Sequence, residues 1–125
     1  MDHLRLGRWG EEIGINYLRE HNYQIISRNY RKKWGELDIV AFDRKSKETV
    51  FLEVKTINRL KTIGLLPEEE LTSEKILKLK RIILSFLNQY HLEDKPWRFD
   101  FLAIEIQNNT LKPDVRHYKD VYLEF

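Results

Sequence analysis

Gly-Glu-Leu-Asp-Ile-Val at residues 35–40 and Val-Phe-Leu-Glu-Val-Lys at residues 50–55 are the two segments that most strongly indicate a fold. Both are rich in β-branched and apolar residues, which is typical of β-strands. The polar segment 43–48 between them has the character of a hairpin connection. An antiparallel hairpin that pairs Val40 with Phe51 would place the two segments side by side.

The charged side chains of these segments fall at matched positions. Because side chains alternate between the two faces of a strand, this pairing sets Asp38 opposite Glu53, and Glu36 opposite Lys55, on one face. Like charges directly across a sheet are destabilising unless something neutralises them, and carboxylate oxygens suit Mg²⁺ or Mn²⁺. The alternative is an ordinary half-solvated sheet face, which we would expect for any one of these residues alone. Two carboxylates and a lysine in matched positions favour a site.

Residues 4–21 have the periodicity of an amphipathic helix. Glu11 lies within its apolar arc, whereas the neighbouring Glu12 points to the other side. Gly10 and Gly14 are one turn apart and cost helix stability, which a close approach of the helix to the sheet would explain. That approach would carry Glu11 toward the charged face. The alternative is a carboxylate at the edge of the arc that reaches water.

The whole chain follows an α/β pattern. We expect a helix over residues 4–21, strands over 23–31, 36–42 and 49–55, a long mobile loop over 56–71, a helix from Thr72 or Ser73 to about Tyr90, a strand over 98–106, a turn at Asn108-Asn109, and a final strand among Val121, Tyr122, Leu123 and Phe125. This order, αβββαβ plus a further β, predicts a mixed central sheet flanked by helices. The length suits a single domain over residues 1–125.

Composition narrows the class of protein. Hydrophobic residues make up 42% of the chain, which is too high for a disordered protein. The net charge of +2 excludes a histone-like polycation, and the lack of cysteine excludes disulfides, thiolate zinc sites and cysteine nucleophiles. No apolar run resembles a membrane span or a secretion signal. These features predict a cytoplasmic protein without a membrane partner.

Basic residues flank the acidic strands. Those that precede residues 36–42 are Arg28, Arg31, Lys32 and Lys33, interleaved with Tyr30 and Trp34. The second helix adds several lysines, of which Lys75 is the first. Cations beside aromatic rings suit a surface that follows phosphates and stacks bases. The alternative is a solvated charged face, which is the commoner origin of a charge run.

Five short motifs follow one another along the chain. They are Gly7-Arg8-x-Gly-Glu11, Arg28-Asn29-Tyr30-Arg31, Gly35-Glu36-Leu37-Asp38, Phe51-Leu52-Glu53-Val54-Lys55 and Arg98-Phe99-Asp100. In this order, and with Lys75 opening the second helix, the chain resembles the YraN family of bacterial proteins over nearly its whole length. The part Asp38…Glu53-x-Lys55 is similar to the PD-(D/E)XK signature of restriction-endonuclease-like folds, which include archaeal Holliday junction resolvases.

The chain departs from the YraN pattern at three places. The family typically has a small residue such as alanine where Gly14 stands, which changes little. The family usually carries an arginine where this chain has Ile57, and the segment 56–71 is longer than usual. Substrate contacts made by that loop therefore transfer least from the resemblance. The family has no established activity of its own.

The resemblance and the charged face together imply a restriction-endonuclease-like fold and a metal-dependent endonuclease that hydrolyses phosphodiesters in nucleic acid, preferably branched DNA. Asp38, Glu53 and Glu11 would hold Mg²⁺ or Mn²⁺, and Lys55 would complete the catalytic set by orienting or deprotonating a water. Glu36 would support the ligands from behind. The residues expected to contact nucleic acid are Arg8, Arg28, Arg31, Lys32, Lys33 and Lys75.

Two other functions stay open. One is a nucleic-acid-binding module with the same fold and no turnover, and the other is an interaction protein that uses the loop and the apolar tail. Asp100, inside an apolar strand, is expected to be structural and to bond a neighbouring arginine or a backbone amide. An enzyme that cuts a junction would need two sites, and hence a symmetric homodimer.

Overall fold

The computed structural model describes residues 3–58, 66–107 and 112–123. Its elements in chain order are α1 (His3–Glu20), β1 (Tyr23–Lys32), β2 (Gly35–Asp43), β3 (Glu48–Asn58), the 3₁₀ helix η1 (Pro67–Glu70), α2 (Ser73–Gln89), β4 (Trp97–Ile106) and β5 (Asp114–Tyr118). The predicted order of helix, three strands, helix and strand is confirmed. Thr72 caps α2, because its side-chain hydroxyl accepts the backbone N–H of Lys75.

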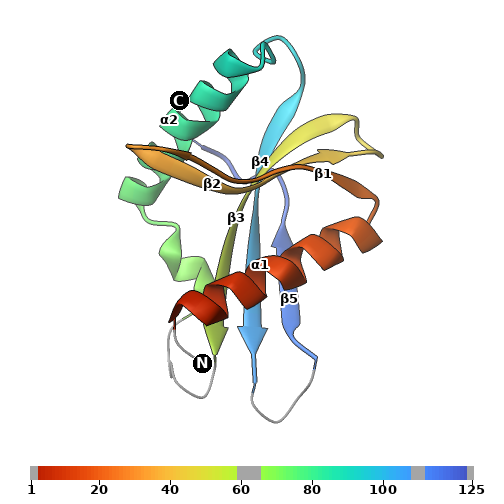
Figure 1. Ribbon diagram of the computed structural model, residues 1–125, viewed down its shortest axis with the longest axis vertical. Helices are drawn as coiled ribbons and strands as arrows, with labels where there is room; N and C mark the ends of the chain where they lie inside the picture. The colour runs from red at the N-terminus through yellow and green to blue at the C-terminus, as the bar shows by residue number, and fades with distance from the viewer. Residues whose placement is uncertain (1–2, 59–65, 108–111, 124–125) are drawn as a thin grey trace.

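The strands form one mixed sheet in the order β1-β2-β3-β4-β5, in which β3 and β4 are parallel and the other neighbours are antiparallel. Figure 1 shows β1 and β2 running across the direction of β3, β4 and β5, so the sheet is strongly twisted. The predicted α/β class with a mixed central sheet is confirmed. Within the described ranges, neither helix is long and apolar enough to cross a membrane.

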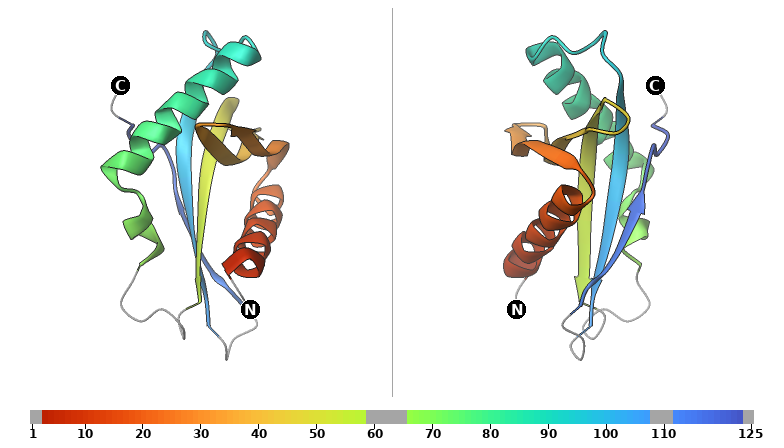
Figure 2. Two further views of the ribbon diagram at one scale, coloured as in Figure 1. Left: turned by 60° about the vertical axis from the view of Figure 1, so that its left-hand side comes forward. Right: turned by 90° about the vertical axis from the view of Figure 1, so that its right-hand side faces the viewer.

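The two helices lie on opposite sides of the sheet (Figure 2). Phe51 belongs to the core cluster under α2, whereas the next residue, Leu52, belongs to the cluster under α1. This alternation is what a strand that is covered on both faces requires. Full burial of each such side chain contributes about 1.5–3 kcal/mol relative to exposure.

Two glycines allow α1 to lie directly on the sheet. A Cβ atom at Gly10 would lie 1.7 Å from the Thr56 hydroxyl oxygen, and one at Gly14 would lie 3.3 Å from a methyl carbon of Leu102. A side chain at residue 10 would therefore push the helix away from β3. The predicted close approach of the helix to the sheet is confirmed at both positions.

The segments between and after the main strands differ from prediction. Thr56 to Asn58 continue β3, and residues 67–70 form η1, so the described parts of the expected loop 56–71 are ordered structure. The final strand is β5, not residues 121–123: the Val121 backbone N–H donates to the Phe99 carbonyl, and Leu123 is buried in the core under α2. Strand β5 has a polar sequence, which hides it from apolar patterning. Residues 59–65, the expected turn at 108–109 and Phe125 lie outside the described residues.

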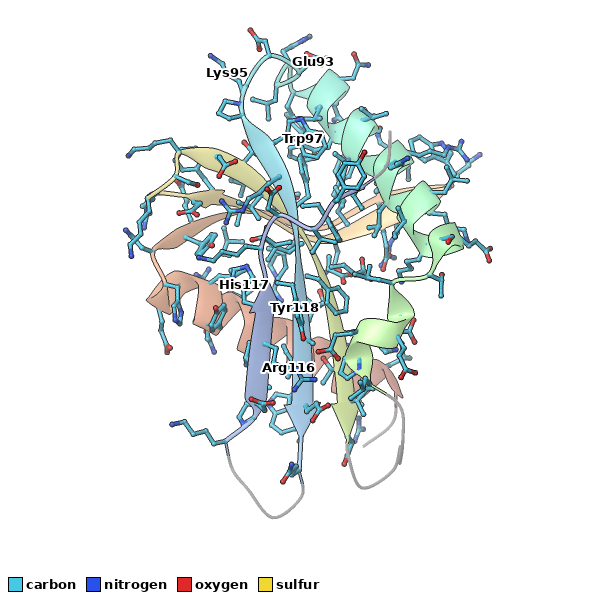
Figure 3. All side chains as sticks on the ribbon, turned by 180° about the vertical axis from the view of Figure 1, so that it is seen from behind. Glu93, Lys95, Trp97, Arg116, His117 and Tyr118 are labelled. Atoms are coloured by element: carbon cyan, nitrogen blue, oxygen red, sulfur yellow. The ribbon has the colours of Figure 1, made fainter. Side chains whose placement is uncertain are left out.

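Strand β5 holds η1 in place through one carboxylate. The Arg116 guanidinium donates to Glu68 at 2.7 Å, and the Tyr118 hydroxyl donates to the same carboxylate at 2.6 Å. Figure 3 shows Arg116 and Tyr118 on β5. The bond from Arg116 holds the pKa of Glu68 at about 2. This contact fixes the segment that leads into α2.

A buried arginine ties β4 to the hairpin between β2 and β3. Arg98 is 7% exposed and donates to Asp100 at 3.0 Å, which is the structural role predicted for Asp100. Its guanidinium also contacts Asp43 at 3.0 Å and Glu48 at 2.8 Å. Asp100 is fully buried and also accepts the backbone N–H of Asp120 at 2.9 Å. The buried guanidinium and the buried Asp100 carboxylate need each other, because an unpaired buried charge is costly.

We expect Asp100→Ala to lower the free energy of unfolding by about 3–5 kcal/mol, because it leaves the buried guanidinium of Arg98 short of an anion. Glu48→Ala is the matched control, since it removes a partner of the same arginine that is 28% exposed. The control should cost about 1 kcal/mol or less. Urea unfolding measures both losses, and equal losses would contradict the central place of Asp100.

We expect Glu68→Gln to remove a stabilising contribution that depends on pH. Because the pKa of Glu68 is lowered from 4.5 to about 2, its ionised form adds stability above pH 4.5, and this stability is lost as the pH falls toward 2. Thermal unfolding of both proteins between pH 7 and pH 2 should show a difference on the order of 1 kcal/mol that shrinks toward acid pH. A difference that is constant with pH would argue against the ion pair.

Candidate active site

The site forms where β2 and β3 separate. The ladder pairs Val40 with Phe51, as predicted, and ends on this side with the pair of Ile39 and Leu52. One residue farther along β2, the Asp38 carboxylate accepts the backbone N–H of Val54 at 2.8 Å. The side chain thus takes the place of a backbone acceptor, and the strands are free to diverge beyond it.

Two buried carboxyl groups meet at this point. Asp38 and Glu53 are each 8% exposed, and their side chains hydrogen-bond to each other. Burial, then the charge of Asp38, raises the pKa of Glu53 to about 8, and burial also raises the pKa of Asp38. A hydrogen bond between two carboxyl groups needs a proton, which the raised pKa values supply. The predicted convergence of Asp38 and Glu53 is confirmed.

The cation that contacts this pair comes from α2. The Lys75 ammonium lies 3.1 Å from Glu53 Oε1. Burial alone would lower the pKa of Lys75, but the charges of Glu53 and Asp38 outweigh it and raise the value. The sequence assigned Lys75 to nucleic-acid contacts, and apart from the family pattern nothing in it points to this ion pair, because the pair forms across two distant elements.

Glu11 approaches Asp38 from α1, on the other side of the sheet. Burial, followed by the charge of Asp38, raises the pKa of Glu11, and the Asn29 side chain hydrogen-bonds to its carboxyl group. Asn29 adopts φ 53°, in the left-handed region that asparagine tolerates. The Glu11 Oε1 atom is buried without a hydrogen-bond partner, alone among the side-chain atoms of the described residues. Its predicted place near the charged face is confirmed.

Glu36 and Lys55 do not oppose each other, so this part of the predicted face is wrong. Glu36 accepts the Arg31 guanidinium at 3.0 Å, and Lys55 pairs with Glu70 of η1 at 3.2 Å. The reason is the divergence of β2 and β3, which carries residue 36 away from β3. Lys55 still shares its strand face with Glu53, two residues earlier.

The donor set suits a hard divalent cation. In the part of the chain that the structure describes, no group of three or more histidine, aspartate or glutamate side chains is arranged so that it could hold a metal ion as it stands. However, the Asp38 and Glu53 carboxyl groups meet, Glu11 lies close enough to feel the charge of Asp38, and Glu11 Oε1 has no partner. Oxygen donors of this kind are the ones that Mg²⁺ and Mn²⁺ prefer. The residues therefore fit such an ion, once Lys75 yields its contact with Glu53.

Basic residues surround a cavity of about 350 Å³ that reaches Glu53. Its cationic lining residues are Arg31, Lys32, Lys33, Lys75 and Lys78. Two other basic residues assigned to nucleic acid lie outside it: Arg28 pairs with Glu12 on α1, and Arg8 is exposed on α1. The structure brings four of the six predicted residues to one cavity.

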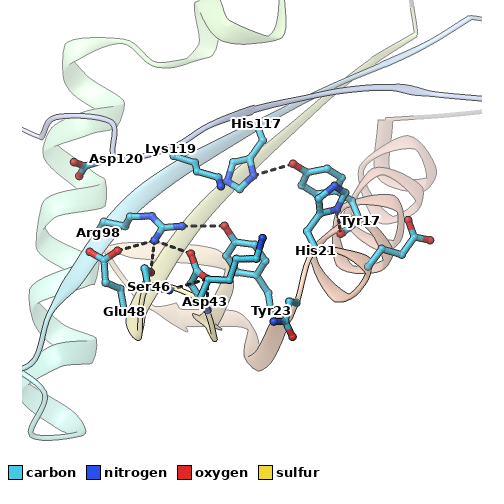
Figure 4. Close-up of a pocket in the computed structure, with 13 residues that line it drawn as sticks. Tyr17, His21, Tyr23, Asp43, Ser46, Glu48, Arg98, His117, Lys119 and Asp120 are labelled. Atoms are coloured by element: carbon cyan, nitrogen blue, oxygen red, sulfur yellow. Dashed lines mark hydrogen bonds and ion pairs between the residues drawn. The ribbon is translucent and has the colours of Figure 1, made fainter.

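A larger cavity, of about 660 Å³, lies beside the buried Arg98 (Figure 4). There His117 Nε2 lies 2.7 Å from Asp100, and the Tyr17 hydroxyl lies 3.0 Å from His117 Nδ1. Burial raises the pKa of Tyr17 and raises that of Tyr23 to about 12, which is opposite to what an activated nucleophile needs. The buried Arg98 and Asp43 pair with each other, so we interpret this cavity as structural.

The chain is similar in sequence to a wider group of proteins. Residues 10–104 match the family described as "Uncharacterised protein family UPF0102". A UPF0102 protein of Geotalea uraniireducens is 39% identical over 121 residues, which cover 97% of this chain and 91% of the relative. UPF0102 proteins of Herpetosiphon aurantiacus and Bacteroides thetaiotaomicron are 32% identical over 125 residues (98% of each chain) and 37% identical over 121 residues (97% of this chain and 94% of the relative). The resemblance to the YraN family is confirmed, since UPF0102 is that family.

We expect Glu53→Gln to raise the free energy of unfolding of the metal-free protein by about 1–3 kcal/mol, because an amide relieves the crowding with Asp38 and still donates a hydrogen bond to it. Glu36→Gln is the matched control, because it neutralises a nearby carboxylate that is exposed. It should change stability by about 0.5 kcal/mol or less. Denaturant unfolding with EDTA at pH 8 measures both, and a loss of stability in Glu53→Gln would refute the crowding.

Proposed function

Because the chain belongs to the UPF0102 family, whose name states no activity, we propose its function from the site: metal-dependent hydrolysis of a phosphodiester bond in nucleic acid. The observation that carries this proposal is the meeting of the Asp38 and Glu53 carboxyl groups beside the orphaned Glu11 oxygen. Structural sites seldom bury carboxyl groups together, since each costs free energy unless it is paired. The cationic cavity next to Glu53 supports an anionic polymer as the substrate.

Each residue of the site has a distinct task in this proposal. Asp38, Glu53 and Glu11 hold the divalent cation, Mg²⁺ or Mn²⁺. When bound, such an ion polarises the scissile phosphate and lowers the pKa of a water. Asp38 is kept in position by the Val54 backbone N–H, so its carboxylate needs no reorganisation. Glu36 lies at one side, where it holds Arg31 for the substrate.

The two lysines act on the substrate phosphate. Lys75 balances the carboxyl pair, and where a divalent cation took over that role its ammonium would be free to bind a phosphate oxygen. Lys55, which is 39% exposed, leaves Glu70 to orient the attacking water or to neutralise charge on the phosphate. The pair of Lys55 with Glu70 is solvent-exposed on both sides, so exchanging it for a contact with phosphate costs little.

The wider setting is also part of the proposal. We take the substrate to be DNA in the first place, and the location to be the cytoplasm, which fits a chain without cysteine. Cutting of a four-way junction would use a homodimer with one site in each subunit.

A second candidate is a nucleic-acid-binding module without turnover. Two observations favour it. In the described ranges no three carboxyl groups are arranged so that they could hold a metal ion, and the Lys75 ammonium already pairs with Glu53. This alternative keeps the cationic cavity and dispenses with the cation. The two functions differ in whether added metal changes the protein.

We expect the wild-type protein to cut at least one member of a panel of linear, flapped and four-way DNA and RNA with Mg²⁺ or Mn²⁺. Asp38→Asn and Lys55→Ala should each lower the rate by roughly 100-fold or more. Glu93→Gln is the control, because this exposed carboxylate follows the far end of α2, which lies about 21 Å from Lys75 along the helix. Cutting that survives both site substitutions would contradict the assignment.

We also expect Mn²⁺ to raise the thermal stability of the wild-type protein, by about 2.7 kcal/mol at a concentration 100 times its dissociation constant. The gain should vanish in Asp38→Asn and persist in Glu93→Gln. A protein that binds DNA but neither cuts it nor responds to Mn²⁺ would favour the binding module.

A further inference from the structure

The turn between β1 and β2 carries an exposed tryptophan beside the cationic cavity. Trp34 is 41% exposed, and its neighbours Lys33 and Gly35 both line the cavity. In the sequence Trp34 stands among basic residues, but the proposed hydrolysis at Asp38 does not use its ring. Exposure alone does not mark a site, since Trp9 is equally exposed, so the position of Trp34 beside the cations carries the argument.

Two contacts hold the turn, and with it the ring, against α2. A Cβ atom at Gly35 would lie 3.4 Å from Cβ of Ile82, so the turn lies directly on the helix, as the ribbon also shows (Figure 1). The guanidinium carbon of Arg81 lies 5.1 Å from the centre of the Trp34 ring. This cation–π contact orients the ring yet leaves 41% of the residue exposed. The ring is thus presented on a fixed support.

The cavity beside it has an excess of positive charge. Arg31 and Lys75 are matched by Glu36 and Glu53, which are the acidic residues of the lining. Lys78 has only a long contact of 3.7 Å to Glu74, which is 82% exposed. No carboxylate of the described residues forms an ion pair with Lys32 or Lys33. Lys32 lies 5.5 Å over the ring of Tyr30, so Lys33 and Lys78 are the lysines best placed to meet phosphate groups.

We propose that the groove between the β1–β2 turn and α2 binds a single-stranded stretch of nucleic acid, with its backbone along Lys33 and Lys78 and an unpaired base stacked on Trp34. In a duplex the faces of the bases are covered by their neighbours, so an aromatic platform is of use only to an unpaired base. The groove ends at Glu53, so the strand it holds leads into the site. The inference rests on the proposed function and narrows its substrate to one with unpaired nucleotides next to the cut.

The test measures binding without turnover. Fluorescence anisotropy in EDTA and 50 mM salt compares a labelled 20-nucleotide oligo(dT) with a 20-base-pair duplex. Wild-type protein should bind oligo(dT) about 10-fold more tightly than the duplex. Trp34→Leu should weaken oligo(dT) binding about 10-fold, in line with the loss of one stacked base, and should change duplex binding less than 2-fold.

Matched variants separate stacking from other effects. Trp9→Leu removes another tryptophan that is also 41% exposed, on α1 and outside the cavity lining, and should leave both affinities unchanged. Trp34→Phe keeps an aromatic ring and should retain most of the oligo(dT) affinity, which also guards against a folding defect in Trp34→Leu. Lys78→Gln should weaken both ligands and reduce the salt dependence by about one counterion.

The outcomes distinguish this inference from the proposed function. If Trp34→Leu binds oligo(dT) as the wild type does, or loses oligo(dT) and duplex binding to the same extent, the inference is overturned. The nuclease proposal would survive that result, since it depends on Asp38→Asn and Lys55→Ala in the cleavage panel. Selective loss of oligo(dT) binding together with cleavage that ignores Asp38→Asn would uphold the single-strand groove and reject the nuclease.

Discussion

One hydrogen bond, from the Val54 backbone N–H to the Asp38 carboxylate, sets the shape of the central sheet. By offering a side-chain acceptor where a backbone carbonyl would stand, Asp38 ends the β2–β3 ladder without leaving a buried N–H unpaired. Beyond it the strands diverge, and the opening admits side chains from both faces. The carboxylate that ends the ladder is also the one that Glu53 and Glu11 approach.

Both helices contribute to this opening, and small residues decide how. On α1, Gly10 removes the atoms that would hold the helix off β3, which brings the next residue, Glu11, close enough to feel the charge of Asp38. On α2, the cap at Thr72 starts the helix so that Lys75 reaches Glu53 from its first turn. The site is therefore formed by the middle of α1, the first turn of α2 and two strands. It needs no long loop among the described residues.

The sequence pattern correctly predicted those parts of the fold that depend on residues close together in the chain. The alternation in residues 50–55 and the turn chemistry of 43–48 gave the correct pairing of Val40 with Phe51, because side-chain period and hairpin closure are short-range constraints. Strand β5 escaped prediction because its edge position lets it carry polar residues such as Arg116. The partners of Lys55 and Glu36 were not predicted either. The prediction continued the β2–β3 pairing through residue 36, whereas the two strands diverge there because of tertiary contacts that local sequence does not reveal.

The contact of Glu68 with Arg116 and Tyr118 connects strand β5 to η1, and through η1 to the candidate site. Glu68 belongs to η1, and the last residue of η1, Glu70, pairs with the Lys55 ammonium. Strand β5 supplies no side chain to the carboxyl cluster, yet through η1 it helps to set the position of Glu70, which pairs with Lys55. Substitutions in this outer strand would therefore alter the position of Lys55. Sequence variation at the edge of the sheet can in this way adjust the geometry at its centre.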